Sequence, residues 1–97
     1  DGESILWAYN KIVNKPQRRK MIITLSDGIP AAGGQPNAGK FTKRVIDNIT
    51  KAGRVEMYGI GIEDNSVKYF YPNFTVLKEA SMLESCLLNV IKNRILR

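Results

Sequence analysis

A glycine-rich stretch, GGQPNAGKFT at residues 33–42, contains residues whose types and spacing could hold a phosphate group. Gly34, Gly39 and Lys40 match the pattern G-x-x-x-x-G-K-[ST], in which backbone N–H groups and a lysine surround nucleotide phosphates. Phe41 stands where the pattern requires a metal-binding hydroxyl. A phosphate loop also follows directly on a buried strand, whereas here the preceding apolar run ends about eight residues before Gly34. These departures favour an ordinary loop over a nucleotide site.

A second polar stretch, Ser26-Asp27-Gly28, follows directly on the apolar run MIITL at residues 21–25. In open parallel sheets, ligands bind at the carboxyl ends of the strands. Asp27 offers a carboxylate and Ser26 a hydroxyl, and a hard divalent cation prefers oxygen ligands of this kind. The same residues are also typical of a turn that ends a strand. Their spacing alone does not decide between a cation site and a turn.

The elements that must position these residues follow from the apolar periodicity. Apolar residues at three- and four-residue spacing predict helices over residues 3–14, 41–52 and 82–95. Runs rich in β-branched residues predict strands over residues 21–25, 54–62 and 74–77. A polar turn with one helical turn is predicted between the last two strands, over residues 63–71. This order predicts an α/β fold with a mostly parallel sheet, flanking helices and right-handed crossovers.

Several residues within these elements carry specific expectations. Gly53 is expected to end the second helix, and Gly59 and Gly61 indicate a close approach of other groups to their strand. Trp7 is expected to pack rather than to bind a ligand. The run at residues 21–25 is expected to be buried on both faces. The last helix is expected to be docked through a stripe of seven apolar residues: Met82, Leu83, Cys86, Leu87, Val90, Ile91 and Ile95.

Length and composition limit the classes of function. A chain of 97 residues forms one domain, or part of one. The net charge is +6, but no aromatic platform accompanies the basic residues, so we expect a solvated face or an acidic protein partner and no specific nucleic-acid role. No apolar run reaches the roughly 20 residues that span a bilayer.

The residues available for catalysis are few. The chain has no histidine, which excludes Ser-His-Asp and Cys-His arrangements within it. Its one cysteine, Cys86, lies in the last apolar stripe, where a thiol acts as a small hydrophobe, so we predict no disulfide and no catalytic residue. These features favour a cytoplasmic protein. The chain begins with Asp1 and its predicted strands make about half of a doubly wound sheet, so we expect a further segment upstream.

Four stretches together carry a family resemblance: DGESILWAYNKI, RRKMIITLSDGIP, VEMYGIGIEDNSVKYFYPNFTVL and the terminal amphipathic helix. This series resembles the C-terminal von Willebrand factor A type domain of the CobT subunit of aerobic cobaltochelatase. The resemblance covers nearly the whole chain, and its most specific parts are DGE-x-I-L-W-A and R-R-x-M-x-x-x-S-D-G-x-P. It implies that residues 1–97 are the C-terminal part of such a domain, with a partial von Willebrand factor A (Rossmann-like) fold.

The resemblance also implies a metal-ion-dependent adhesion site at the top of the sheet. Such a site combines an Asp-x-Ser-x-Ser stretch, a residue from a second loop and an aspartate from a third. Ser26 and Asp27 match the third element and Asp1 lies where the second would be, whereas Asp-x-Ser-x-Ser does not occur in the 97 residues. The implied cofactor, in the full-length domain, is Mg²⁺ or another divalent cation. The implied partner-binding loop contains Gly28, Ile29, Pro30, Gly34, Asn37 and Lys40.

The implied function is that of a noncatalytic subunit. Its partners would be an AAA+ type ATPase subunit and a large chelatase subunit, and the complex inserts cobalt into a corrin ring. The alternatives are a stand-alone α/β binding domain and a metal-dependent hydrolase that uses Asp27 or Ser26. If the strand that carries the absent Asp-x-Ser-x-Ser element normally pairs with residues 21–26, those residues form an exposed edge here, which predicts that the chain associates with itself.

Overall fold

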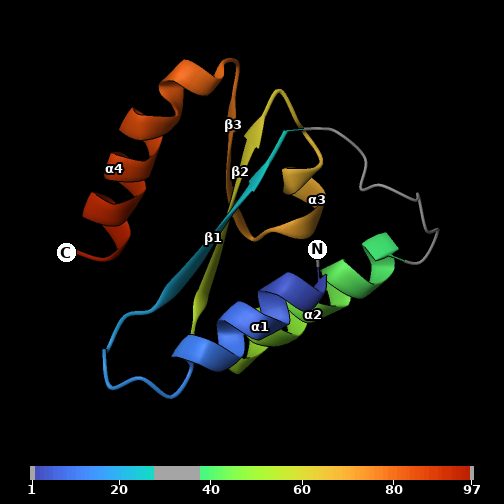
Figure 1. The fold of residues 1–97 in the computed structure, drawn as a ribbon, viewed down its shortest axis with the longest axis vertical. Coiled ribbons are helices and arrows are strands. Elements are labelled where there is room, and N and C mark those ends of the chain that lie inside the picture. The colour runs from blue at the N-terminus through green and yellow to red at the C-terminus, as the bar shows by residue number, and fades with distance from the viewer. Residues whose placement is uncertain (1, 28–37, 97) are drawn as a thin grey trace.

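A parallel three-stranded sheet forms the centre of the fold, in the order β1-β2-β3 (Figure 1). The computed structural model describes residues 2–27 and 38–96. Strand β1 (Met21–Ser26) pairs with β2 (Glu56–Ile62), and β2 pairs with β3 (Asn73–Leu77). Because all the strands are parallel, their carboxyl ends meet at one edge of the sheet. The fold is therefore the predicted α/β fold with a parallel sheet and flanking helices, consistent with a partial von Willebrand factor A fold.

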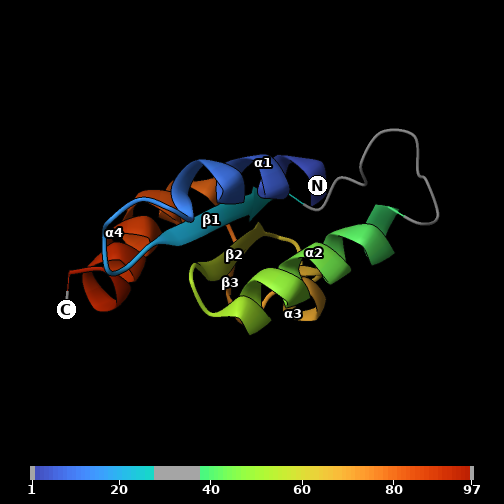
Figure 2. The same ribbon diagram turned by 90° about the horizontal axis from the view of Figure 1, so that it is seen from below.

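Helices α1 (Gly2–Ile12) and α2 (Ala38–Ala52) cover one face of the sheet, and the short helix α3 (Val67–Phe70) lies on the same side (Figures 1 and 2). Helix α2 ends at Gly53, whose φ of 73° is a left-handed conformation that glycine adopts without strain. The core on this face contains eight buried residues from the helices, the sheet and the residues next to them: Ile5, Val13, Ile22, Val45, Ile46, Ile49, Val55 and Met57.

Helix α4 (Leu83–Arg94) covers the opposite face and follows a short 3-10 turn, η1 (Ala80–Met82) (Figure 1). The core here contains four buried residues, Tyr58, Ile60, Leu77 and Val90, so α4 supplies only one of them. Helix α4 is thus docked, but through fewer fully buried side chains than the sequence pattern predicts.

The seven-residue stripe predicted for the last helix is only partly buried. Val90 is buried, whereas Met82 is 47% exposed and Ile91 38% exposed. The prediction was wrong for these two residues: Met82 lies in η1, before α4 begins, and Ile91 lies outside the narrow strip with which a single helix covers a sheet face. A stripe as wide as the predicted one needs neighbours on both sides.

One further burial prediction was wrong, and Trp7 does not pack in the core. Leu25 is 54% exposed, because β1 is the edge strand of the sheet and the described residues leave part of its α4 face uncovered. Trp7 is 66% exposed, and its ring lies 5.2 Å from the Nζ atom of Lys11, one turn later on α1, rather than in the core.

The helices that the structure describes are all too short or too polar to span a bilayer. The element boundaries otherwise agree with the sequence pattern to within a few residues. The largest difference is at the start of α2, which begins at Ala38 rather than near Phe41.

Candidate metal site

Ser26 and Asp64 meet at the carboxyl edge of the sheet. Ser26 is the last residue of β1, and Asp64 follows the end of β2. The Ser26 Oγ atom donates a hydrogen bond to Oδ2 of Asp64, and the backbone N–H of Ser66 donates to Oδ1 of the same carboxylate at 2.9 Å. Asp64 is the buried charged residue of the described chain, with 8% of its surface exposed. The two hydrogen bonds hold its carboxylate in one orientation beside the end of β1.

A glycine allows the chain to bring Asp64 into this position. A Cβ atom added at Gly61 would overlap the backbone carbonyl of Asp64, so the segment after β2 can fold back only over a residue without a side chain. Glu63, at the bend, has a φ of 53°, an uncommon conformation for a residue other than glycine. Its N–H donates to the carbonyl of Leu77 at 2.7 Å, which fixes the bend to the end of β3.

A second glycine on β2 makes room for an aromatic ring that supports the sheet beneath the site. The ring of Tyr71 lies against Gly59, where any added Cβ atom would overlap it. Burial raises the pKa of the Tyr71 hydroxyl above its usual value of 10.0, and a hydrogen bond with the Thr24 side chain acts in the opposite, weaker direction. The close approaches predicted at Gly59 and Gly61 are therefore confirmed.

The residues predicted for the site fall into three groups. Ser26 and Asp27 lie together at the end of β1, with Asp27 exposed. Lys40 lies in the first turn of α2 and is also exposed. The others lie outside the described residues, so their predicted roles stay predictions: Asp1, Gly28, Ile29, Pro30, Gly34 and Asn37.

Asp64 is a residue that sequence reasoning missed, since residues 63–71 were interpreted as a polar turn. A signal for it was present. Asp27 directly follows β1, Asp64 is the second residue after β2, and the carboxyl ends of adjacent parallel strands lie side by side. Applying to β2 the rule that selected Asp27 would have selected Asp64 as well.

The chemistry of these residues fits a hard divalent cation. Ser26, Asp27 and Asp64 offer only oxygen donors, which Mg²⁺ prefers, and a bound Mg²⁺ keeps several waters, so it needs few protein ligands. The described residues contain no cluster of three or more His, Cys, Asp or Glu side chains able to hold a metal ion. Ser26, Asp27 and Asp64 therefore suit a cation bound through one or two carboxylates, with open positions, rather than one enclosed by protein.

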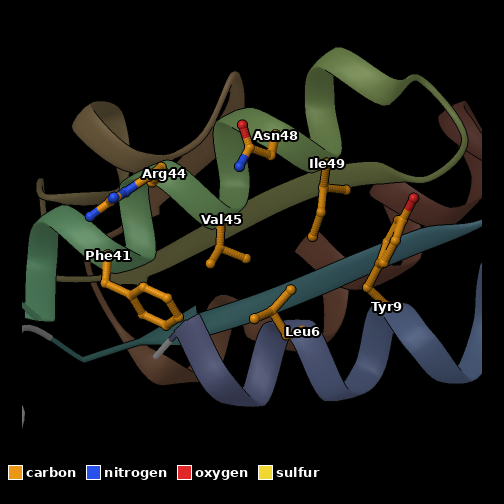
Figure 3. Close-up of a pocket in the computed structure, with 7 residues that line it drawn as sticks. All are labelled: Leu6, Tyr9, Phe41, Arg44, Val45, Asn48 and Ile49. Atoms are coloured by element: carbon orange, nitrogen blue, oxygen red, sulfur yellow. The ribbon is translucent and has the colours of Figure 1, made fainter.

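A separate cleft lies between α1 and α2, with a volume of about 420 Å³ (Figure 3). Val45 and Ile49 of α2 point toward α1, and Leu6 points back toward them, while Arg44 and Asn48 lie at the rim (Figure 3). Phe41 and Tyr9 complete the lining. With an apolar floor and no acidic residue or cysteine, this cleft has no group suited to metal chemistry, and it is distinct from the carboxyl edge.

One family model matches the chain, and it covers residues 1–96. Its description is "Cobalamin biosynthesis protein CobT VWA domain". No solved structure matches the chain.

Proposed function

Because the chain belongs to the family of CobT von Willebrand factor A domains, we propose that it acts as a noncatalytic protein-interaction module of a CobT-like subunit. The family description refers to cobalamin biosynthesis. The observation that supports the proposal is the Ser26–Asp64 hydrogen bond at the carboxyl edge of the sheet. It orients a hydroxyl and a carboxylate at the end of β1, where the exposed Asp27 follows Ser26 in the chain.

The proposed site binds Mg²⁺ or another divalent cation through Ser26, Asp27 and Asp64. A cation bound there would supply an open coordination position for a carboxylate of the protein partner. The buried carboxylate of Asp64 positions the Ser26 hydroxyl by accepting its hydrogen bond, and the Ser66 N–H in turn holds Asp64. Asp27, exposed at the same edge, is the residue that the partner approaches.

The proposed partners are an AAA+ type ATPase subunit, which hydrolyses the nucleotide, and a large chelatase subunit, which holds the corrin ring that receives cobalt. The contact surface would combine the carboxyl edge with the loop that contains Gly28, Ile29, Pro30, Gly34 and Asn37, and with the exposed Lys40 at the start of α2. We place this complex in the cytoplasm, where the free thiol of Cys86 stays reduced.

Site-resolved metal titration tests the cation site. Mn²⁺ added to the isotope-labelled chain should broaden the amide signals of Ser26, Asp27 and Asp64 first, because paramagnetic broadening falls steeply with distance, and Mg²⁺ should compete. Asp27→Ala should weaken Mn²⁺ binding about tenfold or more, since loss of even an outer-shell partner of a metal ligand typically costs about 10–100-fold in affinity. Asp47→Ala is the matched control, since Asp47 is an exposed aspartate of α2 that pairs with Lys43. Equal affinity in both variants would refute the site.

Partner binding is a second, separate test. The chain and its Asp27→Ala variant are compared for binding to an AAA+ type ATPase in Mg²⁺ and after chelation. Binding that needs both Mg²⁺ and Asp27 supports the interaction module. Binding that is unchanged in the variant counts against the metal-edge contact and favours the stand-alone binding domain. Turnover of phosphoesters or peptides by the chain alone, dependent on Mg²⁺, would instead establish the hydrolase alternative.

A further inference from the structure

The cleft between α1 and α2 has an apolar side chain open to solvent on each of its two sides. Leu6 of α1 is 37% exposed and Phe41 of α2 is 39% exposed. Single exposed apolar residues are common on protein surfaces. These two, however, line the same cleft, together with the buried Val45 and Ile49 (Figure 3). A partner that covered Leu6 and Phe41 would therefore extend the apolar core of this face outward.

A glycine at the start of α1 brings the two helices into contact at one end of the cleft. The ring of Phe41 lies against Gly2, where an added Cβ atom would overlap it. From Phe41 the lining continues along α2 to Ile49, a rise of about 12 Å along the helix. The α1–α2 cleft is therefore an elongated groove, about two helical turns long, between two neighbouring helices.

A row of polar and basic residues follows the α2 side of the cleft. Arg44 and Asn48 line it, and Lys40 and Lys51 continue the same row at helical spacing, one turn before and one turn after. All four residues are exposed. Lys43, which lies outside this row, has an ion-pair partner one turn later on α2. Among the residues described, Lys40, Arg44 and Lys51 have no acidic partner.

The α1 side of the cleft does not carry such a row. Leu6 and Tyr9 line it, and the residues one turn before and after Leu6 are Glu3 and Asn10. A ligand in the cleft therefore meets positive charge along α2 and not along α1. The net charge of +6 predicts either a solvated basic face or an acidic protein partner. Three unpaired cations beside an apolar groove favour the acidic partner at this place.

We propose that the α1–α2 cleft binds an amphipathic helix of a protein partner, with apolar residues in the cleft and acidic residues along α2. In this mode of recognition, apolar anchors at i, i+3 or i+4 and i+7 enter a groove, and two turns of groove accommodate two or three of them. Acidic residues at helical spacing on the partner would then face Lys40, Arg44 and Lys51. The inference adds a second surface to the proposed function, meets the first surface at Lys40 and does not rest on the cation site.

The lining fits a small-molecule ligand less well than it fits a helix. Small-molecule sites combine apolar walls with a few polar groups that converge on the ligand. Here the charged and amide groups of the lining, Arg44 and Asn48, lie along one side of the cleft and continue into the row that ends at Lys40 and Lys51. A linear row of this kind matches an extended acidic surface.

Fluorescence anisotropy with a defined peptide tests the proposal. The probe is a fluorescein-labelled, stapled helix of about 18 residues, long enough to stay helical, with leucines at i, i+4 and i+7 and glutamates along one flank. One control peptide has lysines in place of the glutamates, and another has serines in place of the leucines. The glutamate peptide should bind about tenfold more tightly than either control, and more weakly as salt screens the charges. No binding of the glutamate peptide, or equal binding of the glutamate and lysine peptides, would overturn the proposal.

Matched variants of the chain test where the peptide binds. Arg44→Glu should weaken binding of the glutamate peptide about tenfold, because it places like charges together. Lys92→Glu makes the same change in net charge at an exposed residue of α4, on the opposite face, and should leave the affinity unchanged. Leu6→Asn should also weaken binding, whereas Leu88→Asn, at a residue of α4 that is 61% exposed, should not. Equal affinities within either pair of variants would overturn the proposal. Circular dichroism establishes that each variant is folded.

Sedimentation of the chain without peptide tests whether a second copy occupies the cleft instead. We expect the same oligomeric state in wild type and in Leu6→Asn, since the partner helix and not a second copy is the proposed occupant. Self-association that is lost in Leu6→Asn would assign the cleft to a second copy and overturn the proposal. All these measurements are made in EDTA. Failure of the cation site would therefore leave them unchanged, and their failure would leave the metal titration unchanged.

Discussion

The two faces of the sheet differ in how their helices are held. The face under α1 and α2 has eight buried residues in one apolar cluster, whereas the face under α4 has four. A pocket of about 590 Å³ remains between α4 and the sheet, lined in part by Thr75, Asn89 and Asn93. The comparison shows that α2, the more strongly amphipathic helix, shares its face with α1 and is well buried, whereas α4 is less amphipathic, covers its face alone and is less buried.

Polar contacts at one residue compensate in part for the thinner packing of α4. The Nη1 atom of Arg94, in the last turn of α4, lies 3.3 Å from Oε1 of Glu56 on β2. The guanidinium of Arg94 also lies 5.3 Å from the ring centre of Tyr58. The Tyr58 hydroxyl in turn hydrogen-bonds the Thr75 side chain at 2.6 Å. The Arg94–Glu56 pair is partly exposed, so it contributes less than about 1 kcal/mol. Helix α4 is therefore held by one buried side chain, by partly buried neighbours and by these contacts of Arg94.

The largest expected effect comes from breaking the denser face. Ile46 of α2 is fully buried, with 0% of its surface exposed. Ile46→Ala should lower the free energy of unfolding by about 2–5 kcal/mol, through lost apolar burial and the cavity that remains. Urea denaturation followed by circular dichroism measures this loss of unfolding free energy. A loss below 1 kcal/mol would show that this core is loosely packed.

A somewhat smaller effect is expected at the glycine beneath the candidate site. Gly61→Ala should destabilise the chain by about 1–3 kcal/mol, because the new methyl group overlaps the Asp64 carbonyl and the backbone must shift. The matched control is Gly39→Ala in α2, where an added Cβ atom is 3.8 Å from the Phe70 ring, an ordinary contact. Gly39→Ala should be neutral or slightly stabilising, since alanine is the better helix former.

The metal titration sharpens the glycine comparison. If Asp64 is a ligand, Gly61→Ala should weaken Mn²⁺ binding together with stability, whereas Gly39→Ala should leave the affinity unchanged. Equal stability of the two glycine variants would contradict the close approach at Gly61.

The α4 face should tolerate the same kind of truncation that the denser face does not. Ile91 is 38% exposed, so Ile91→Ala should change the free energy of unfolding by no more than about 1 kcal/mol. Measured beside Ile46→Ala under the same conditions, this isoleucine pair quantifies the difference between the faces. Equal losses at Ile46 and Ile91 would mean that α4 is docked as firmly as α2.

The smallest effect is a pH dependence that arises from Tyr71. Its pKa is raised in the folded chain by burial, so the folded state holds the hydroxyl proton more tightly than the unfolded state does. The contribution to stability is complete below the unfolded pKa of about 10 and is lost as pH rises through the folded pKa. Thermal unfolding from pH 8 upward should therefore show a steeper loss of stability above pH 10 in wild type than in Tyr71→Phe. Identical pH profiles of thermal unfolding in wild type and Tyr71→Phe would refute the raised pKa of Tyr71.

Much of the fold was predictable because its signals are local. The apolar spacing along residues 41–52 and the run at residues 21–25 indicate a helix and a strand regardless of what surrounds them. Gly53, Gly59 and Gly61 likewise signalled a helix end and two close approaches, all of which the structure confirms. The burial of Leu25 and Met82 was predicted wrongly, because apolar character does not reveal whether a neighbour covers the residue.

The candidate site was only partly predictable for the same reason. Ser26 and Asp27 could be found from one strand end, since the rule that places ligands at carboxyl ends needs only the order of elements. The hydrogen bond from the Ser26 hydroxyl to the Asp64 carboxylate depends on the bend at Glu63 and on the absence of a side chain at Gly61. The contact between Ser26 and Asp64 cannot be derived from spacing, because these two residues are 38 positions apart in the chain.

The sequence by itself therefore determined the elements, their order, the parallel sheet and the family. These depend on short-range periodicity and on connection rules that hold for any chain with this order of elements. Only the tertiary structure decided which stripes are covered and which carboxylate lies beside Ser26. Those outcomes depend on the β1–β2 register and on helix packing across both faces, which are set by contacts between residues distant in the chain.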